Sequence, residues 1–383
     1  METSAELMPG LPDCLARECL LCLPFHALYV ARNVSKKWRE EITSPSFYRL
    51  RKAAGFACPV VAVSLMIDLH LSLASGDEND LLFPYSIRVA LFEPITGIWT
   101  EVPAIHVRPC YPISCCYMAA VGHELVLIID CDNRVTKVNS KVHVYNMIAG
   151  TWRQGKSMPP LLRRYAAAYA SGPGAVFLAG GNDLCNRCCL NSALSYDVVA
   201  DEWVRLPNMS RPLAMYACEG MFADGAFRVL EFDTYRNGWR SADEFDVEAG
   251  HWKKSERKIE SAICVAAAEG REYMCRDGGS RKLEVLEFVG GYGDGGAGEV
   301  LDMNGGATAD GWRRLGVVPH DGLGPTYMVA WDGGIMVYNR QTAYVLEIGG
   351  AAAAAAAIEK NKWERIDWPD DLDIKRFPCI FQL

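Results

Sequence analysis

The sequence predicts a mainly β protein in which a six-bladed β-propeller follows a small all-α module. Three observations support this prediction. Tryptophans recur at intervals of about 50 residues with one longer interval, a period typical of propeller repeats. An aromatic residue stands seven positions before four of them, and apolar residues at helical spacing fill the first 50 positions, ahead of the repeat. The six tryptophans are Trp99, Trp152, Trp203, Trp252, Trp312 and Trp363.

Composition excludes several classes of protein. Half of the 383 residues are hydrophobic and a tenth are aromatic, which is enough for a folded core and argues against global disorder. The net charge of −8 argues against a nucleic-acid binder, because such proteins normally carry a basic surface. No uninterrupted apolar run of about 18 residues occurs, so we expect no membrane-spanning helix.

The N-terminus and the cysteines indicate the compartment. The first ten residues hold two acids and no basic residue, unlike a secretory signal. The 15 cysteines are odd in number and scattered along the chain. We therefore expect reduced thiols in the cytoplasm, the nucleus or both.

The first helix is expected to begin at Pro12 and Asp13, because proline suits the first helical position and an acid complements the helix dipole. Leu15, Cys19 and Leu23 then repeat at helical spacing. We expect the cysteines at positions 14, 19 and 22 to be small buried helix residues.

Two further short helices complete the predicted module. Pro24 interrupts the first helix, and a second includes Leu28 and Ala31. A third is expected to begin with Ser35 as its N-cap, to place Trp38 and Ile42 on one face, and to end at Ser44-Pro45. Three helices of this size bury little surface, so the module should depend on a partner for stability. The alternative is a helical hairpin that caps the domain behind it.

A second register accompanies the tryptophans. The aromatic residue seven positions upstream is followed each time by a polar or acidic residue, and a turn-prone stretch separates the pair from the tryptophan. This pattern predicts two strands joined by a tight turn. The four pairs are Phe92-Glu93, Tyr145-Asn146, Tyr196-Asp197 and Phe245-Asp246.

The third repeat shows a whole blade. Residues 164–170 alternate in polarity, 175–178 are apolar, and strands are also expected over 193–196 and 202–207. Gly180 and Gly181 allow a tight backbone turn where a side chain would collide. The pairs Gly278-Gly279 and Gly333-Gly334 are expected to play the same role in later blades.

Domain boundaries follow from these patterns. We expect the helical module over residues 1–50, a linker over 51–57 and the propeller over 58–383. Low-complexity insertions, rich in glycine or alanine, interrupt it at 290–306 and 349–357. The first blade lacks one strand, and the apolar tail 377–383 has no partner of its own. A propeller must close its ring, so the tail is expected to form the innermost strand of blade one beside residues 60–65.

The N-terminal module resembles an F-box. The resemblance rests on Leu11-Pro12, Leu23-Pro24, the string Val34-Ser35-Lys36-Lys37-Trp38-Arg39 and the string Ser44-Pro45-Ser46-Phe47-Tyr48. The third repeat resembles a kelch repeat, and the whole chain resembles the plant F-box/kelch-repeat family. One departure is Cys22, where many F-boxes carry a basic residue.

The resemblance implies a function. F-box/kelch proteins are non-catalytic substrate receptors: the F-box docks a Skp1-type adaptor and through it a cullin-RING ubiquitin ligase, and the propeller captures a protein substrate for ubiquitination. No cofactor is implied. The positions that match the adaptor-binding residues are Leu11, Pro12, Leu15, Leu20, Leu23, Pro24, Val34 and Trp38.

Arginines are the candidate substrate-binding residues. They fall in the expected connections between second and third strands and between blades, which should share one rim of the ring. A guanidinium can bind carboxylate or phosphate groups through two parallel hydrogen bonds. The candidates are Arg163, Arg164, Arg187, Arg211 and Arg236, accompanied by Arg88, Arg108, Arg134 and Arg240.

Two alternatives stay open. A kelch scaffold would bind a partner without degrading it. A metal-dependent kelch enzyme or specifier protein would need clustered His, Asp or Glu, but the seven histidines are scattered and form no HExxH-type motif. The spacing of Cys185 and Cys188 suits a zinc ligand pair, yet no second pair accompanies it, so we expect no metal.

Overall fold

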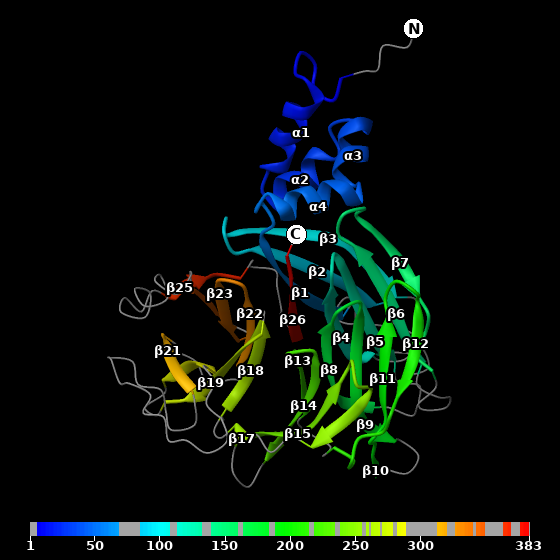
Figure 1. Ribbon diagram of the computed structural model, residues 1–383, viewed down its shortest axis with the longest axis vertical. Coiled ribbons are helices and arrows are strands. Elements are labelled where there is room, and N and C mark those ends of the chain that lie inside the picture. Colours follow the sequence, from blue (N-terminus) through cyan, green and yellow to red (C-terminus); the bar gives the residue numbers. More distant parts are fainter. Residues whose placement is uncertain are drawn as a thin grey trace, which may run out of the picture.

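The structure, a computed structural model, is a ring of six β-sheets with a group of helices standing on one end (Figure 1). It describes residues 6–68, 85–107, 113–131, 139–159, 164–183, 188–213, 218–233, 238–254, 258–259, 262–268, 270–278, 282–288, 312–319, 326–339, 342–348, 363–368 and 376–382. Within these residues, no helix combines the length and apolar character needed to cross a membrane.

The helix module contains four helices, one more than predicted. They are α1 (Asp13–Leu21), α2 (Phe25–Ala31), α3 (Lys36–Ile42) and α4 (Pro45–Ala53). Ser35 caps α3 as expected, since its Oγ accepts a hydrogen bond of 3.1 Å from the Trp38 amide. Ser44 does the same for α4, with Pro45 at the first helical position. Ser44-Pro45 therefore ends one helix and starts the next, and the predicted linker 51–57 begins inside α4.

The core of the helix module lies on the other side of α1 from the one predicted. Ala16 and Leu20, one helical turn apart, are fully buried against α2, α3 and α4. Cys14, Cys19 and Cys22 carry free, exposed thiols, so the prediction that they are buried was wrong. Apolar residues cover both sides of α1, and periodicity alone does not tell which side faces inward.

Each sheet of the ring is one blade. Blade one contains β26 (Arg376–Gln382), β1 (Pro59–Asp68), β2 (Tyr85–Glu93) and β3 (Ile98–Val107); blade two contains β4 (Ile113–Val121), β5 (Glu124–Cys131), β6 (Asn139–Asn146) and β7 (Thr151–Gly155). Blade three contains β8 (Arg164–Gly172), β9 (Ala175–Asp183), β11 (Ala193–Asp197) and β12 (Glu202–Leu206), with the short β10 (Cys188–Cys189) paired to β9. All pairings are antiparallel within these blades.

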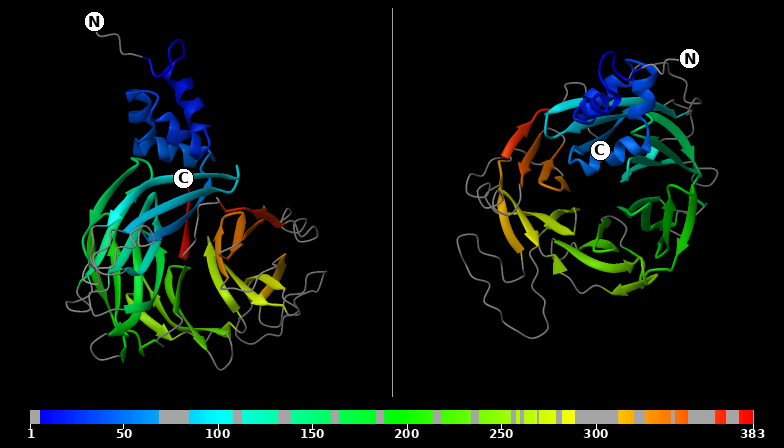
Figure 2. Two further views of the ribbon diagram at one scale, coloured as in Figure 1. Left: turned by 180° about the vertical axis from the view of Figure 1, so that it is seen from behind. Right: turned by 45° about the horizontal axis from the view of Figure 1, so that its top comes forward.

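The remaining blades follow the same order. Blade four contains β13 (Cys218–Ala223), β14 (Ala226–Asp233), β15 (Gly238–Asp246) and β16 (His251–Lys254), with β17 (Lys258–Ile259) paired to β15. Blade five contains β18 (Ala262–Ala268), β19 (Arg271–Asp277), β20 (Leu283–Phe288) and β21 (Trp312–Val318). Blade six contains β22 (Tyr327–Trp331), β23 (Gly334–Tyr338), β24 (Ala343–Glu347) and β25 (Trp363–Ile366). Figure 2 shows the six sheets arranged around one axis. The predicted fold class is confirmed.

The tryptophan register is confirmed by strand pairing. In blades one to four the aromatic residue of the third strand lies directly opposite the tryptophan of the fourth, as Tyr196 does to Trp203. The ring centres of these pairs are 4.8 to 5.2 Å apart. Trp312 and Trp363 pair in the same way with Phe288 and Leu346.

The tryptophans also tie neighbouring blades together. The indole Nε1 of Trp152, in blade two, donates a 2.7 Å hydrogen bond to the Pro103 carbonyl of blade one. Trp203 donates likewise to the Lys156 carbonyl at 2.8 Å, and Trp252 to the Pro207 carbonyl at 2.6 Å. Each indole therefore reaches the outer strand of the preceding blade, or the residue that follows it.

Ring closure is as predicted. β26 pairs with β1 and is the innermost strand of blade one, with Val60 opposite Phe381 and Val61 opposite Ile380. The chain's last strand thus completes the blade that its first strand begins.

The glycine pairs do not all play one role. Gly180 and Gly181 lie near the end of β9 with positive φ angles of 74° and 101°. A Cβ on Gly180 would come within 2.6 Å of Leu213 Cδ1. Gly333-Gly334 was expected to be equivalent, but it occupies the turn before the second strand of blade six, between β22 and β23. The predicted insertions 290–306 and 349–357, and Gly279, lie outside the described residues.

Candidate functional site

The residues predicted to meet an adaptor divide by exposure. Pro12, Leu15 and Val34 are exposed; the side chains of the last two are 46% and 63% accessible. Leu11, Leu23, Pro24 and Trp38 are half-buried. Leu20 is 0% exposed and packs inside the module. Leu20 therefore supports the surface residues from beneath and has no exposed area that a partner could contact.

Trp38 has a structural role besides any contact with a partner. Its indole Nε1 donates a 2.8 Å hydrogen bond to the Leu7 carbonyl, which fastens the segment before α1 to α3. Its ring packs against the buried cluster that contains Leu20 and Ile42. Replacing it would disturb the module as well as its surface.

Sequence reasoning missed part of this surface. Val30 and Leu50 are also exposed, as are the thiols of Cys14 and Cys19 in α1 and of Cys22 just after it. Monomeric proteins seldom leave a contiguous apolar patch exposed without a function, and here several large apolar side chains are exposed on helices of seven to nine residues. For Val30 the signal lay in the apolar run 27–31, which a seven-residue helix cannot bury on all sides.

A single carboxylate joins the helix module to the propeller. Glu93, the last residue of β2, accepts a 3.1 Å hydrogen bond from the Phe25 amide at the start of α2 and lies 2.7 Å from Nδ1 of His26. Cys58 and Thr96 donate to the same carboxylate at 3.4 and 3.1 Å. The side chain is 3% exposed, so these four contacts take the place of water.

The protonation of Glu93 follows from this environment. Burial alone would raise the pKa of its carboxyl, but the hydrogen bonds from His26, Phe25, Cys58 and Thr96 outweigh burial and hold the pKa below its ordinary value. The group is therefore ionised near neutral pH, and His26 Nδ1 is the donor in their contact. Burial near Glu93 raises the pKa of the Cys58 thiol to about 11, which keeps that thiol protonated.

Apolar packing supports the same junction. Phe25 is buried in the propeller core with residues of blade one such as Val60 and Ile87. Arg51 of α4 is buried and donates to the carbonyls of Leu21 and Leu23, at 2.5 Å each. The helix module is thus seated on blade one by α2 and braced by α4.

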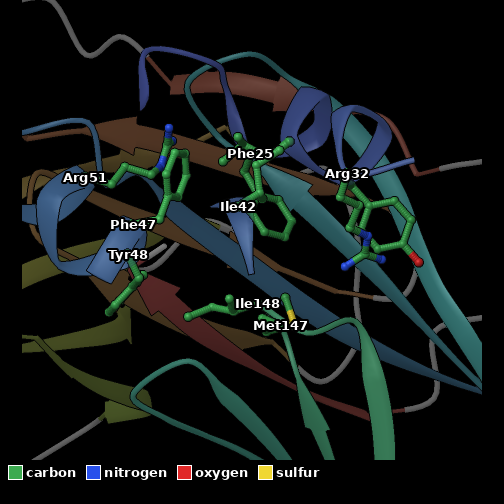
Figure 3. Close-up of a pocket in the computed structure, with 10 residues that line it drawn as sticks. Phe25, Arg32, Ile42, Phe47, Tyr48, Arg51, Met147 and Ile148 are labelled. Carbon is green, nitrogen blue, oxygen red and sulfur yellow. The ribbon is translucent and has the colours of Figure 1, made fainter. Parts of the chain in front are cut away.

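A pocket lies beside this junction, between the helices and blade two. Figure 3 shows Met147 and Ile148, from the turn between β6 and β7, on the propeller side of it, with Phe25 and Ile42 on the helix side. The Arg32 guanidinium carbon lies 3.8 Å from the centre of the Tyr29 ring, a cation–π arrangement. The lining is mostly apolar and aromatic.

The structure describes only some of the candidate substrate-binding arginines. Arg211 is described, and its side chain is 41% exposed and forms an ion pair of 2.5 Å with Glu231 of β14. Arg164 belongs to β8. Arg163, Arg187 and Arg236, like Arg108 and Arg134, lie outside the described residues.

Three of the wider set correct the expectation that these arginines lie in loops. Arg88, Arg164 and Arg240 belong to β2, β8 and β15. Arg88 bonds Glu101 on the neighbouring β3, with Nε 3.1 Å from a carboxylate oxygen. Polar residues that alternate along a strand resemble loop residues in the sequence, which explains the error.

The strand order defines two ends of the ring. The helix module contacts turns that join third and fourth strands, at Glu93 in blade one and at Met147 in blade two. In an antiparallel blade, the second strand ends, and the third begins, at the opposite end of the sheet. Arg211 pairs with Glu231 near the end of β14, the second strand of blade four, so it lies toward that opposite end.

The structure shows no gathered metal ligands in the part of the chain that it describes. Cys188 is exposed and Cys189 is half-buried, and both thiols are free. Cys185 lies outside the described residues.

The fold and this geometry define a class of protein: a six-bladed propeller that carries a small helical module on one end. Residues 8–50 match the family model of the F-box domain, and residues 163–210 match that of the kelch motif. The chain is 32% identical over 281 residues to the Arabidopsis thaliana F-box/kelch-repeat protein At1g15670, a match that covers 70% of this chain and 77% of the relative. It is 24% identical over 373 residues to the F-box/kelch-repeat protein At1g80440 of the same plant, covering 94% and 96% of the two chains. The chain belongs to the F-box/kelch-repeat family.

Proposed function

We propose that this protein is the substrate-recognition subunit of a Skp1-cullin-F-box ubiquitin ligase. The observation that carries the proposal is the F-box-type helix module of residues 8–50, with exposed apolar residues, seated on a kelch propeller. The module would dock a Skp1-type adaptor, and the propeller would hold a protein substrate. Ubiquitin transfer would be catalysed by the partners, in the cytoplasm or the nucleus, with no cofactor bound by this chain.

The adaptor contact would rest on the exposed residues Pro12, Leu15 and Val34, extended by the half-buried Leu11, Leu23, Pro24 and Trp38. Burying a leucine or valine side chain in such an interface contributes about 1.5 to 3 kcal/mol. Two or three such residues supply the hydrophobic centre that small docking interfaces need.

The substrate would bind at the end of the ring away from the helices, where Arg163, Arg164, Arg187, Arg211 and Arg236 are the proposed contacts. Acidic or phosphorylated segments suit guanidinium groups. Arg211 already pairs with Glu231, so a substrate carboxylate would have to displace that partner.

A binding experiment tests the adaptor contact. Purified Skp1-type adaptor is titrated with the full chain, with the variants Leu15→Asp and Val34→Asp, and with Val199→Asp as the matched control. Val199 is an apolar residue of blade three whose side chain is 90% exposed, so its replacement should be neutral. We expect the two helix-module variants to lose at least tenfold in affinity and the control to keep it, by the burial argument above. A wild-type chain that fails to bind the adaptor would refute the proposal and favour a scaffold that does not direct degradation.

A further inference from the structure

The polar residue that ends the third strand has one role in blades two, three and four. Asn146 accepts hydrogen bonds from the amides of Ile148 and Ala149 at 3.0 and 2.8 Å. Asp197 accepts from Val199 and Ala200 at the same distances, and Asp246 accepts from Ala249 at 2.9 Å. In each case a short side chain folds back on its own turn and fixes the connection to the tryptophan strand.

Blade one departs from this pattern at Glu93. The side chain is one methylene longer than that of Asp, and its carboxylate accepts from the Thr96 hydroxyl of its own turn but also reaches Phe25 and His26 of α2. Main-chain bonds also close this turn, as they do in blades two and four: the amides of Thr96 and Gly97 donate to the Glu93 carbonyl at 3.2 and 2.9 Å. The side chain at this position therefore stabilises its own turn in blades two to four, whereas in blade one it also holds the helix module.

The helix that Glu93 holds has little to start it otherwise. α2 has seven residues, and its N-cap is Pro24, which supplies no side-chain hydrogen bond. An isolated helix of this length is unstable, because the first turn is costly to form. The Glu93 carboxylate satisfies the Phe25 amide and places a negative charge at the positive end of the helix.

α2 in turn supports the docking face. Leu28 and Ala31 pack in the module core with Leu20 of α1 and Ile42 of α3. Val34 follows α2 directly, and Leu23 and Pro24 precede it. A displacement of α2 would therefore move both ends of the proposed adaptor surface.

We infer that Glu93, a propeller residue, is a positioning residue for adaptor docking: it fixes α2 on blade one and thereby sets the geometry of the F-box surface. The inference rests on the proposed function for its link to the adaptor, but the hold on α2 can be measured without any partner. Chain length at this position, rather than charge alone, is the property that matters.

Three variants of the full chain test this. Glu93→Asp restores the residue type found in blades three and four, so it keeps the charge and can cap its own turn, but it falls short of α2. Glu93→Gln keeps the length and can still accept from the Phe25 amide. Asp197→Glu makes the reverse change in blade three, away from the helices, and is the matched control. Two quantities are measured: amide hydrogen exchange across residues 25–31 and affinity for a Skp1-type adaptor.

We expect Glu93→Asp to speed exchange across α2 at least tenfold and to weaken adaptor binding several-fold, because a buried charge-assisted hydrogen bond is lost. Glu93→Gln should fall between this variant and the wild type, and Asp197→Glu should match the wild type in both measurements. Wild-type exchange in Glu93→Asp, or an equal effect of Asp197→Glu, would overturn the inference. If α2 loosens while adaptor affinity is unchanged, the positioning role is refuted. If the wild-type chain does not bind the adaptor at all, both the proposed function and the role of Glu93 in docking are refuted. Amide hydrogen exchange then still decides whether Glu93 holds α2.

Discussion

The indole of Trp99 in blade one lies against that of Trp368, which follows the last strand of blade six, with ring centres 5.4 Å apart. This contact joins the first and last blades, which the chain also connects as it passes from β25 of blade six to β26, the innermost strand of blade one. Trp368 also meets Tyr338 of β23 edge to face. The seam of the ring is therefore closed by side chains as well as by the pairing of β26 with β1.

Removing this aromatic contact should weaken the seam. We expect Trp368→Ala to lower the free energy of unfolding by about 2 kcal/mol, because the half-buried ring contributes both area and aromatic contacts. Urea denaturation followed by circular dichroism measures this. Val199→Ala, in an exposed turn, is the control and should be neutral; an equal loss in both variants would contradict the role given to Trp368.

Deleting the closing strand should be more severe. A chain that ends before residue 376 lacks β26 and leaves the inner edge of β1 unpaired, so we expect insoluble protein on expression. A chain that lacks only Leu383 retains the whole of β26 and should behave as the wild type does. A truncated chain with an unaltered thermal transition would rule out closure by this strand.

A buried ion network links blades four and five. Arg228 of β14 bonds Glu272 of β19 and Glu244 of β15, and both Arg228 and Glu272 are about 6% exposed. Glu272→Gln removes the most buried carboxylate from Arg228 and leaves it with the more exposed Glu244 and Asp224, so it should cost about 2 kcal/mol of stability. Lys156→Gln is the comparison, since Lys156 forms an exposed pair with Glu202 at 3.4 Å, which should cost below about 1 kcal/mol. Equal costs, measured by denaturation, would contradict the difference in burial.

Acid should loosen the junction between the modules. The pKa of Glu93 is lower in the folded protein than in the unfolded chain, so its contribution is complete above the unfolded value of about 4.3 and is lost as the pH falls through the folded value. We expect hydrogen exchange across α2, corrected for the intrinsic effect of pH, to accelerate below about pH 4.3 in the wild type. Glu93→Gln should show less of this acceleration; identical pH profiles would mean that another group controls the junction.

Much of the fold could be predicted from the spacing of residues. The pairing of a tryptophan with an aromatic residue recurs in several blades, and such a repeat can be recognised in a single sequence. The closing role of the tail followed from the missing strand of blade one. Two local features could not be found in this way. Pro45 is compatible with the end of one helix and the start of the next, and Gly333 resembles Gly180 in sequence but occupies another turn.

The candidate site was less accessible to sequence reasoning. Leu20 and Leu15 have the same chemistry, and only the packing of α1 on its neighbours decides that one is buried and the other exposed. Glu93 was recognised as part of the repeat, but its contact with α2 depends on one methylene and on a fold contact between residues far apart in the chain. The ion pair of Arg211 with Glu231 could not be predicted either, because it also joins residues that are distant in the sequence.

The pairing of β26 with β1 also has a kinetic consequence. Residue 60 finds its partner at residue 381, so this contact is among those that close the largest loop in the protein. Contacts of such long range form slowly, because the chain loses the entropy of closing a large loop before the contact stabilises it. During synthesis one edge of β1 stays unpaired while the rest of the ring is made, so this is the interval in which the chain is most open to aggregation through a strand edge.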